Sequence, residues 1–143
     1  MPRAFRLASR DTLGGVFELS INAEFAAAHA IRIRGELEPL HGHNWHVTAG
    51  FAGETLDADG LLVDFHVLER TLLALVSEHH NRNLNERPPF STGTNPTAEQ
   101  VARHLADELV RRLPPEALRR ARLIALTVTE APGCAATYRP PRA

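Results

Sequence analysis

The chain of 143 residues contains no lysine, so all sixteen of its basic residues are arginine. Without a lysine amine the protein cannot form a Schiff base with a carbonyl substrate, and it cannot build a P-loop, which requires a lysine. Cysteine is nearly absent as well, because Cys134 is the only one. A single thiol excludes an internal disulfide, a Cys-x-x-Cys redox pair and a thiolate-rich zinc site within one chain.

Long apolar runs and an excess of charge are also missing. No segment approaches the roughly 20 apolar residues needed to cross a bilayer, and the first residues lack the charged-then-apolar order of a signal peptide. The net charge is only -1, and the one cluster of basic residues, at 119–122, is interpreted as a solvated helix end. We therefore expect a cytoplasmic protein that binds neither nucleic acid nor membrane.

The apolar content is sufficient for one core. A chain of this length with 43% hydrophobic residues predicts a single compact domain spanning residues 1–143. Apolar and polar residues alternate with a period of two between 16 and 27, which predicts a strand. Gly35 and Pro39 predict a loop over 31–40 that leads into a second strand near 43–53.

Two amphipathic helices are predicted in the middle of the chain. Asp64 is a candidate N-cap for a helix whose apolar stripe continues to about residue 80. Thr97 and Gln100 fit a capping box that opens a second helix, which the pair Pro114-Pro115 ends. The polar, proline-bearing segment between the helices, 81–95, is predicted to be a long loop.

Two further strands are predicted at 123–129 and 134–138, where they can pair with each other. The resulting order is strand, strand, helix, helix, strand, strand (ββααββ). A four-stranded antiparallel sheet with two helices on one face is an α+β layer structure. Its bare edges invite pairing with another subunit, so we expect a homo-oligomer.

Three of the eight histidines form a metal-binding pattern. His41 and His43 are two residues apart, so in an extended segment their imidazoles leave the same face. His29 ends the preceding predicted strand, and antiparallel pairing would bring it alongside them. Three imidazoles without a thiolate are typical of a catalytic zinc that keeps one position open. The alternative is that His41 and His43 are loop residues bonded to the backbone around Gly42.

The remaining histidines in this part of the chain are not assigned to a metal. His46 lies three residues after His43 and therefore faces the other side of the strand. His66 and His104 fall inside the predicted helices and are interpreted as surface residues.

Six short motifs occur in order along nearly the whole chain. They are FAAAH (25–29), LHGHNW (40–45), VDF (63–65), LN (84–85), NPTAE (95–99) and TE (129–130). Together they resemble the 6-pyruvoyl-tetrahydropterin synthase and 6-carboxy-tetrahydropterin synthase family. The resemblance implies a tunnelling fold (T-fold), zinc bound by His29, His41 and His43, and 7,8-dihydroneopterin triphosphate as the pterin substrate. It also implies trimers that stack as hexamers, with sites between subunits.

Glu130 matches the family glutamate that binds the pterin ring. A carboxylate can accept two parallel hydrogen bonds from the amino group and ring N–H of a pterin, as it does from a guanidinium group. The resemblance therefore implies that Glu130 binds the substrate. Without the resemblance, a glutamate at a strand end would be interpreted as an exposed charge.

The catalytic motif departs from the usual family pattern. The synthases typically carry a cysteine four residues before the first histidine of HGH, where this chain has Leu37. Cys134 lies too far along the chain to replace it by alignment. Glu38 instead forms an ExxHGH motif, which resembles a branch in which glutamate replaces cysteine and the product is 6-hydroxymethyl-dihydropterin. Glu38 is therefore the candidate general base, although Glu36 lies only two residues away.

The Asp-His pair that precedes Leu-Asn in many family members is altered too. The strict match here is His80-Asn81, and a one-residue slip would place His79 and His80 there. We favour His80 as the catalytic proton carrier. The alternative is a histidine at a helix end, stabilised by the helix dipole.

The sequence thus predicts a zinc-dependent pterin synthase or lyase, in which zinc polarises an oxygen of the substrate side chain. The product is left open between 6-carboxy-tetrahydropterin, on the 7-deazaguanine (queuosine) route, and 6-hydroxymethyl-dihydropterin, on the folate route. One alternative is a family member that binds zinc and a pterin without turnover. Another is a histidine-rich fold that holds no metal.

Overall fold

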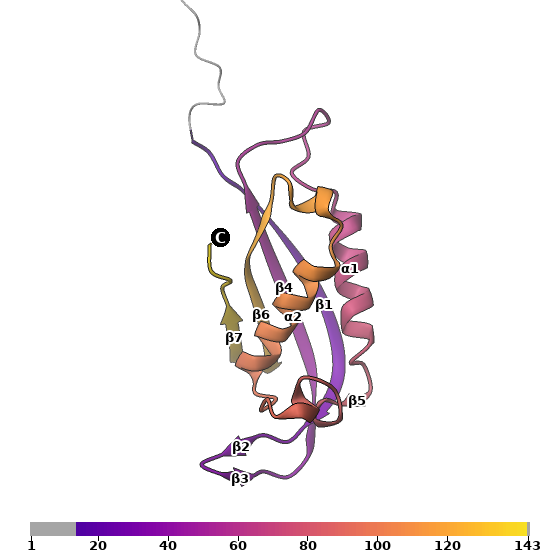
Figure 1. Cartoon of the computed structure of the whole chain (residues 1–143), viewed down its shortest axis with the longest axis vertical. Coiled ribbons are helices and arrows are strands. Elements are labelled where there is room, and N and C mark those ends of the chain that lie inside the picture. The colour runs from indigo at the N-terminus through magenta and orange to yellow at the C-terminus, as the bar shows by residue number, and fades with distance from the viewer. Residues whose placement is uncertain (1–13, 143) are drawn as a thin grey trace, which may run out of the picture.

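The computed structural model describes residues 14–142, in which two helices cover one face of a single main sheet (Figure 1). The spatial order of its strands is β5-β1-β4-β6-β7. Their bounds are Phe17–His29 (β1), His41–Gly53 (β4), Arg82–Asn83 (β5), Arg122–Ala131 (β6) and Cys134–Tyr138 (β7). The α+β class and the helix layer are confirmed. The expected single domain also includes positions 1–13 and 143, which lie outside the described residues.

The two long strands β1 and β4 form the centre of the sheet. They pair antiparallel along their whole length, from Phe17 opposite Gly53 to His29 opposite His41. Alternate residues face the helices and are buried, as the period-two pattern predicts. Near the end that carries the histidines, Phe25 stacks on the fully buried Trp45 with 5.9 Å between ring centroids. Trp45 in turn packs against His29 and His43.

Helix α1 (Phe65–Ser77) begins where the sequence predicts, because the Asp64 carboxylate accepts a hydrogen bond from the backbone N–H of His66. It ends at Ser77, before the expected residue 80. Helix α2 (Ala98–Arg112) begins with Thr97, whose hydroxyl oxygen accepts from the N–H of Gln100. Neither of these helices is long and apolar enough to span a membrane.

Both helices bury one apolar face against the sheet. The buried residues of α1 and α2 join the inward side chains of β1, β4 and β6 in one hydrophobic cluster. The helical members of that cluster are Leu68, Leu72, Leu75, Val76, Val101, Ala102, Leu105, Ala106 and Leu109. Their spacing of three and four residues is the stripe that predicted both helices.

The segments expected to be loops contain additional short elements. Within 81–95, β5 pairs parallel with Ala27–Ala28 at the edge of the sheet, and two 3₁₀ helices follow, η2 (Leu84–Glu86) and η3 (Phe90–Thr92). The sheet therefore has five strands instead of the expected four. A strand of two residues is too short to show any alternation, which is why the sequence pattern does not reveal it.

A hairpin lies between β1 and β4. Its strands, β2 (Arg32–Ile33) and β3 (Glu36–Leu37), form a separate two-stranded sheet that projects beyond the end of the main one (Figure 1). Gly35 adopts a positive φ of 82° at its turn, a conformation that glycine tolerates at little cost. Glu38 directly follows the second strand of this hairpin and precedes β4.

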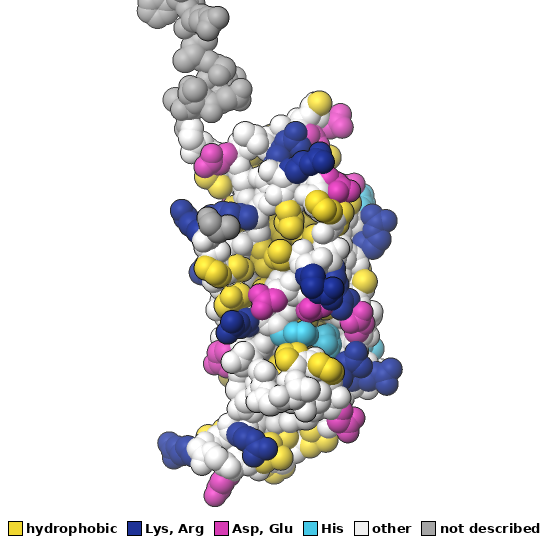
Figure 2. Space-filling view, in the orientation of Figure 1, with side chains coloured by type: hydrophobic (Ala, Val, Ile, Leu, Met, Phe, Trp, Pro, Cys, Tyr) yellow, Lys and Arg dark blue, Asp and Glu magenta, His cyan; other side chains and the backbone are white. Residues whose placement is uncertain are grey.

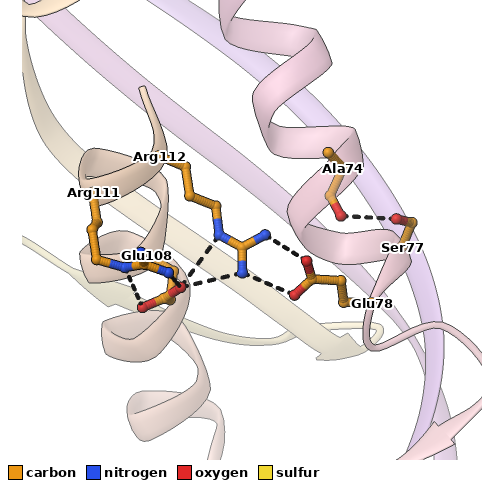
Figure 3. A network of polar contacts seen from close by, with 6 residues as sticks. All are labelled: Ala74, Ser77, Glu78, Glu108, Arg111 and Arg112. Atoms are coloured by element: carbon orange, nitrogen blue, oxygen red, sulfur yellow. Dashed lines mark hydrogen bonds and ion pairs between the residues drawn. The ribbon is translucent and has the colours of Figure 1, made fainter. Parts of the chain in front are cut away.

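An arginine network joins the ends of the two helices (Figure 3). Arg112 donates to both carboxylate oxygens of Glu78, at 2.7 and 2.8 Å, and also to Glu108 at 3.2 Å. Hydrogen bonds from Arg111, followed by those from Arg112, lower the pKa of Glu108 to about 2. The bidentate contact fixes the C-terminal end of α1 against α2.

Candidate metal and substrate site

His29, His41 and His43 meet at one end of the sheet, on the face that the helices cover. The strand register puts His29 opposite His41, and His43 follows two residues later on the same face. The ring centroids are 4.7 to 5.1 Å apart, and one ligand nitrogen from each ring lies within 4.8 Å of the others. The three imidazoles therefore converge as the spacing predicts. The alternative of a loop is wrong, because His41 and His43 both lie in β4.

Backbone carbonyl groups orient two of these rings. The Nδ1 atom of His29 lies 2.7 Å from the carbonyl oxygen of Pro96, and that of His41 lies 3.0 Å from the carbonyl oxygen of Pro39. A carbonyl oxygen only accepts, so in the neutral imidazole Nδ1 carries the proton and Nε2 presents a lone pair. Histidines that bind metals in proteins are usually fixed through the second ring nitrogen in this way.

The ring nitrogens that point into the cluster have no partner of their own. The Nε2 atoms of His29 and His43 are buried and make no hydrogen bond within residues 14–142. Leaving such atoms unpaired costs about 1–3 kcal/mol each, whereas a bound metal ion would use their lone pairs. The three nitrogen donors, with no thiolate among them, fit a metal ion of the zinc type.

The surroundings of His43 favour the neutral imidazole, which is the form that binds a metal. Burial is the main reason that the pKa of His43 lies below its ordinary value. The nearby carboxylate of Glu130 opposes this shift, while His29 and His41 reinforce it. Trp45 packs edge-on against His43 and His29, and its indole N–H donates to the Ala27 carbonyl oxygen.

Two partly buried carboxylates flank the histidines. Glu130 Oε2 lies 3.7 Å from His29 Nε2, and Glu38 Oε1 lies 3.6 Å from His41 Nδ1. Glu130 and His43 also line a cavity of about 590 Å³ that opens beside β6. The site thus combines three nitrogen donors, two acids and room for an organic ligand.

Of the two acids in the hairpin, Glu38 is the one that approaches the histidines. Its Oε1 atom accepts a hydrogen bond from the N–H of Ile31 at 3.1 Å. Glu36 lies in the exposed strand β3. Leu37, which stands where the family usually has cysteine, is exposed as well, and so is Cys134 at the start of β7.

His80 is not brought into this cluster within one chain. Its Nδ1 atom accepts a hydrogen bond from the N–H of Ala26 at 3.1 Å, at the side of β1 where β5 pairs. The cluster of potential metal ligands contains only His29, His41 and His43 among the described residues. Helix α1 ends three residues before His80, so this residue is not part of the last helical turn.

His79 and His104 form a second histidine pair, which the sequence pattern does not reveal. His79 is only 4% exposed and its ring contacts Phe25 and His104, with centroids 6.0 and 5.7 Å away. His104 also packs on Phe90. The expected surface position is therefore wrong for half-buried His104 but right for exposed His66. On the face covered by the helices, histidine side chains reach the surface among arginine and acidic groups (Figure 2).

We expect His79 to make the folded protein sensitive to acid. Burial, followed by nearby His104 and Arg87, lowers its pKa from 6.5 to about 4. The unfolded chain therefore binds more protons than the folded chain between these pH values, so stability falls as the pH drops from 6.5 towards 4. The full shift corresponds to up to roughly 3 kcal/mol in the free energy of unfolding.

Urea unfolding of the wild type and of His79→Leu, measured between pH 4 and pH 7, tests this expectation. The leucine variant should lose less stability on acidification than the wild type, while the variant His66→Leu, at an exposed histidine, should follow the wild-type curve. Parallel curves for the wild type and His79→Leu would show that His79 does not carry the effect.

Comparisons with known proteins agree with this arrangement. Residues 18–141 match the family model described as 6-pyruvoyl tetrahydropterin synthase. The 6-carboxy-5,6,7,8-tetrahydropterin synthase of Bacillus subtilis (strain 168) is 34% identical over 99 residues, in a match that covers 65% of this chain. The matched part also spans 65% of that relative, slightly less than two thirds of its length.

Solved structures share the fold over almost their whole length. The 6-pyruvoyl tetrahydropterin synthase of Caenorhabditis elegans superposes with a TM-score of 0.75 at 21% identity, over 89% of this chain and 97% of that one. A Plasmodium vivax 6-pyruvoyltetrahydropterin synthase in which alanine replaces a catalytic glutamate gives 0.74 at 20% identity, over 87% and 98%. The expected T-fold is thereby confirmed. With the family model matched from residue 18 to residue 141, the chain belongs to the 6-pyruvoyl tetrahydropterin synthase family.

Proposed function

We propose that this protein is a zinc-dependent synthase or lyase that acts on 7,8-dihydroneopterin triphosphate. The observation that carries the proposal is the convergence of His29, His41 and His43 beside two carboxylates. Family membership and the name of the B. subtilis relative support a pterin substrate. The ligand set supports zinc, because magnesium and calcium prefer oxygen donors.

The three histidines hold the metal in this proposal and leave one coordination position for the substrate. When bound, zinc would supply Lewis-acid polarisation of an oxygen on the C6 side chain of the pterin. Trp45 and the carbonyl groups of Pro39 and Pro96 keep the rings oriented, so the site is formed before substrate arrives.

Glu38 is the proposed general base. Its Oε1 atom is occupied by the N–H of Ile31, so Oε2 is the atom left to take a proton from the substrate side chain. The catalytic glutamate of the P. vivax synthase supports this role, since alanine replaces it in one variant structure and cysteine in another.

His80 is the proposed proton carrier. Because it does not approach the metal cluster of its own chain, the proposal requires it to act across a subunit boundary. Both outer strands, β5 and β7, have a side with no partner among the described residues, which favours assembly through sheet edges. The proposed assembly is a homo-oligomer, a trimer or hexamer.

Glu130 is the proposed substrate-binding residue. It lines the same cavity as His43, and its carboxylate lies next to His29. In the proposed role, the Glu130 carboxylate accepts two parallel hydrogen bonds from the amino group and the ring N–H of the pterin, as the family resemblance implies.

Incubation of the zinc-loaded protein with 7,8-dihydroneopterin triphosphate, followed by mass analysis, tests the proposal. Retro-aldol cleavage between the first two side-chain carbons would give 6-hydroxymethyl-dihydropterin, which the ExxHGH motif favours. Formation of 6-carboxy-tetrahydropterin would instead follow the B. subtilis relative. Unchanged substrate, with zinc and pterin both bound, would overturn the enzymatic proposal in favour of a binding protein.

A further inference from the structure

Two asparagine side chains form hydrogen bonds with the backbone just after the end of β1. Asn85 accepts a hydrogen bond from the N–H of Ala30 and donates one to its carbonyl oxygen, both at 2.8 Å. Asn95 does the same with Arg32, at 2.9 and 3.0 Å. Each side-chain amide thus uses its donor and its acceptor on one residue, as a neighbouring strand would.

Ile31 connects this asparagine clamp, formed by Asn85 and Asn95, to the proposed base. Its N–H donates to Glu38 Oε1 at 3.1 Å, and its carbonyl oxygen accepts from the N–H of Glu38 at 3.0 Å. The residues on both sides of Ile31 are the two that the clamp holds. The orientation of the Ile31 peptide groups, and with it the position of the Glu38 carboxylate, therefore depends on the clamp.

Apolar packing does not replace these hydrogen bonds. The large apolar side chains of the hairpin, Ile33 and Leu37, are 54% and 56% exposed. Between the hairpin and the loop that carries Asn95 lies a cavity of about 350 Å³, lined by both asparagines. A hairpin with little buried apolar surface opens easily unless polar contacts hold it.

We infer that Asn85 and Asn95 are positioning residues that hold Glu38 at the metal cluster. The inference rests on the proposed function, in which Glu38 is the base. Loss of either amide should let the hairpin move, and a displacement of about 1 Å at a reacting group can reduce a rate by about 100-fold. Neither asparagine is in the ligand cluster, so the metal and the pterin should still bind.

The test uses Asn85→Ala and Asn95→Ala in the full chain, with Asn22→Ala as the matched control. Asn22 also takes part in a side-chain hydrogen bond, because its Oδ1 atom accepts from the Thr48 hydroxyl. This bond lies on the exposed face of the sheet, which the helices do not cover. Each clamp variant should lower kcat by about 10- to 100-fold with little change in KM. Amide hydrogen exchange at Glu38 should accelerate in both clamp variants and stay unchanged in the control.

Asn85→Asp and Asn95→Asp provide a second measurement that keeps the fold closer to the wild type. A carboxylate retains the acceptor but loses the donor, so these variants should fall between wild type and alanine in kcat and in exchange. Exchange and kcat that match the control would overturn the inference. So would a loss of bound zinc equal to the loss of rate, because the asparagines would then act through the metal ligands. If wild type itself shows no turnover, the proposed function fails, and the exchange measurement still decides whether the clamp holds the hairpin.

Discussion

Replacing Glu38 by glutamine should lower kcat on 7,8-dihydroneopterin triphosphate by about 10²- to 10⁴-fold, the usual contribution of a positioned general base. Glutamine has the same size and can still accept the hydrogen bond that Ile31 donates to Glu38 Oε1. It cannot take a proton from the substrate. The hairpin should therefore keep its conformation, and zinc content and the Kd for a pterin should stay close to those of the wild type.

Glu36→Gln is the matched control for this experiment. Glu36 belongs to the same hairpin, but it is exposed in β3 and directed to solvent. Steady-state kinetics of both variants, together with metal analysis and pterin binding, separate the roles. A Glu38→Gln protein with wild-type kcat would exclude Glu38 as the base, and a larger loss in Glu36→Gln would transfer that role to its neighbour.

The metal cluster could be predicted from sequence because its geometry depends on local rules. A spacing of two residues puts His41 and His43 on one face of any strand. An antiparallel partner that ends in a histidine then brings a third ring alongside, and the register of β1 with β4 does so at His29. The same alternation predicts that His46 lies on the opposite face of the strand. There its Nδ1 atom lies 2.8 Å from Glu24 Oε1.

The surroundings of the cluster could not be predicted in the same way. The contacts of Asn85 and Asn95 with the hairpin join residues 55 and 63 positions apart, and no periodic pattern records such pairings. The burial of His79 depends on where α1 ends, and helix ends are the least certain part of a sequence-based assignment. The sequence alone does not show which of Glu36 and Glu38 approaches the histidines. That distinction comes from the register of a hairpin whose strands are two residues long.

Replacing His43 by alanine should abolish stoichiometric zinc binding. Removal of a hydrogen-bond partner behind a ligand already reduces metal affinity about 10- to 100-fold, and removal of the ligand itself should exceed that. His43 suits this experiment better than His29, because His29 is 1% exposed and its loss would leave a cavity in the core. The partly exposed side chain of His43 leaves less of a gap, so the fold should persist.

The matched control is His46→Ala, three residues further along β4. Its ring faces away from the cluster and bonds Glu24 on the exposed side of the sheet. Metal analysis of proteins purified without added zinc, followed by competition with a chelator, should give a metal-free His43→Ala protein and a fully loaded control. Because both changes remove one imidazole from the same strand, a difference in zinc content between them points to the face on which the ring lies. Retention of zinc by His43→Ala would mean that the three imidazoles do not bind one ion. The proposed site would then have no metal to act as the Lewis acid of the pterin chemistry.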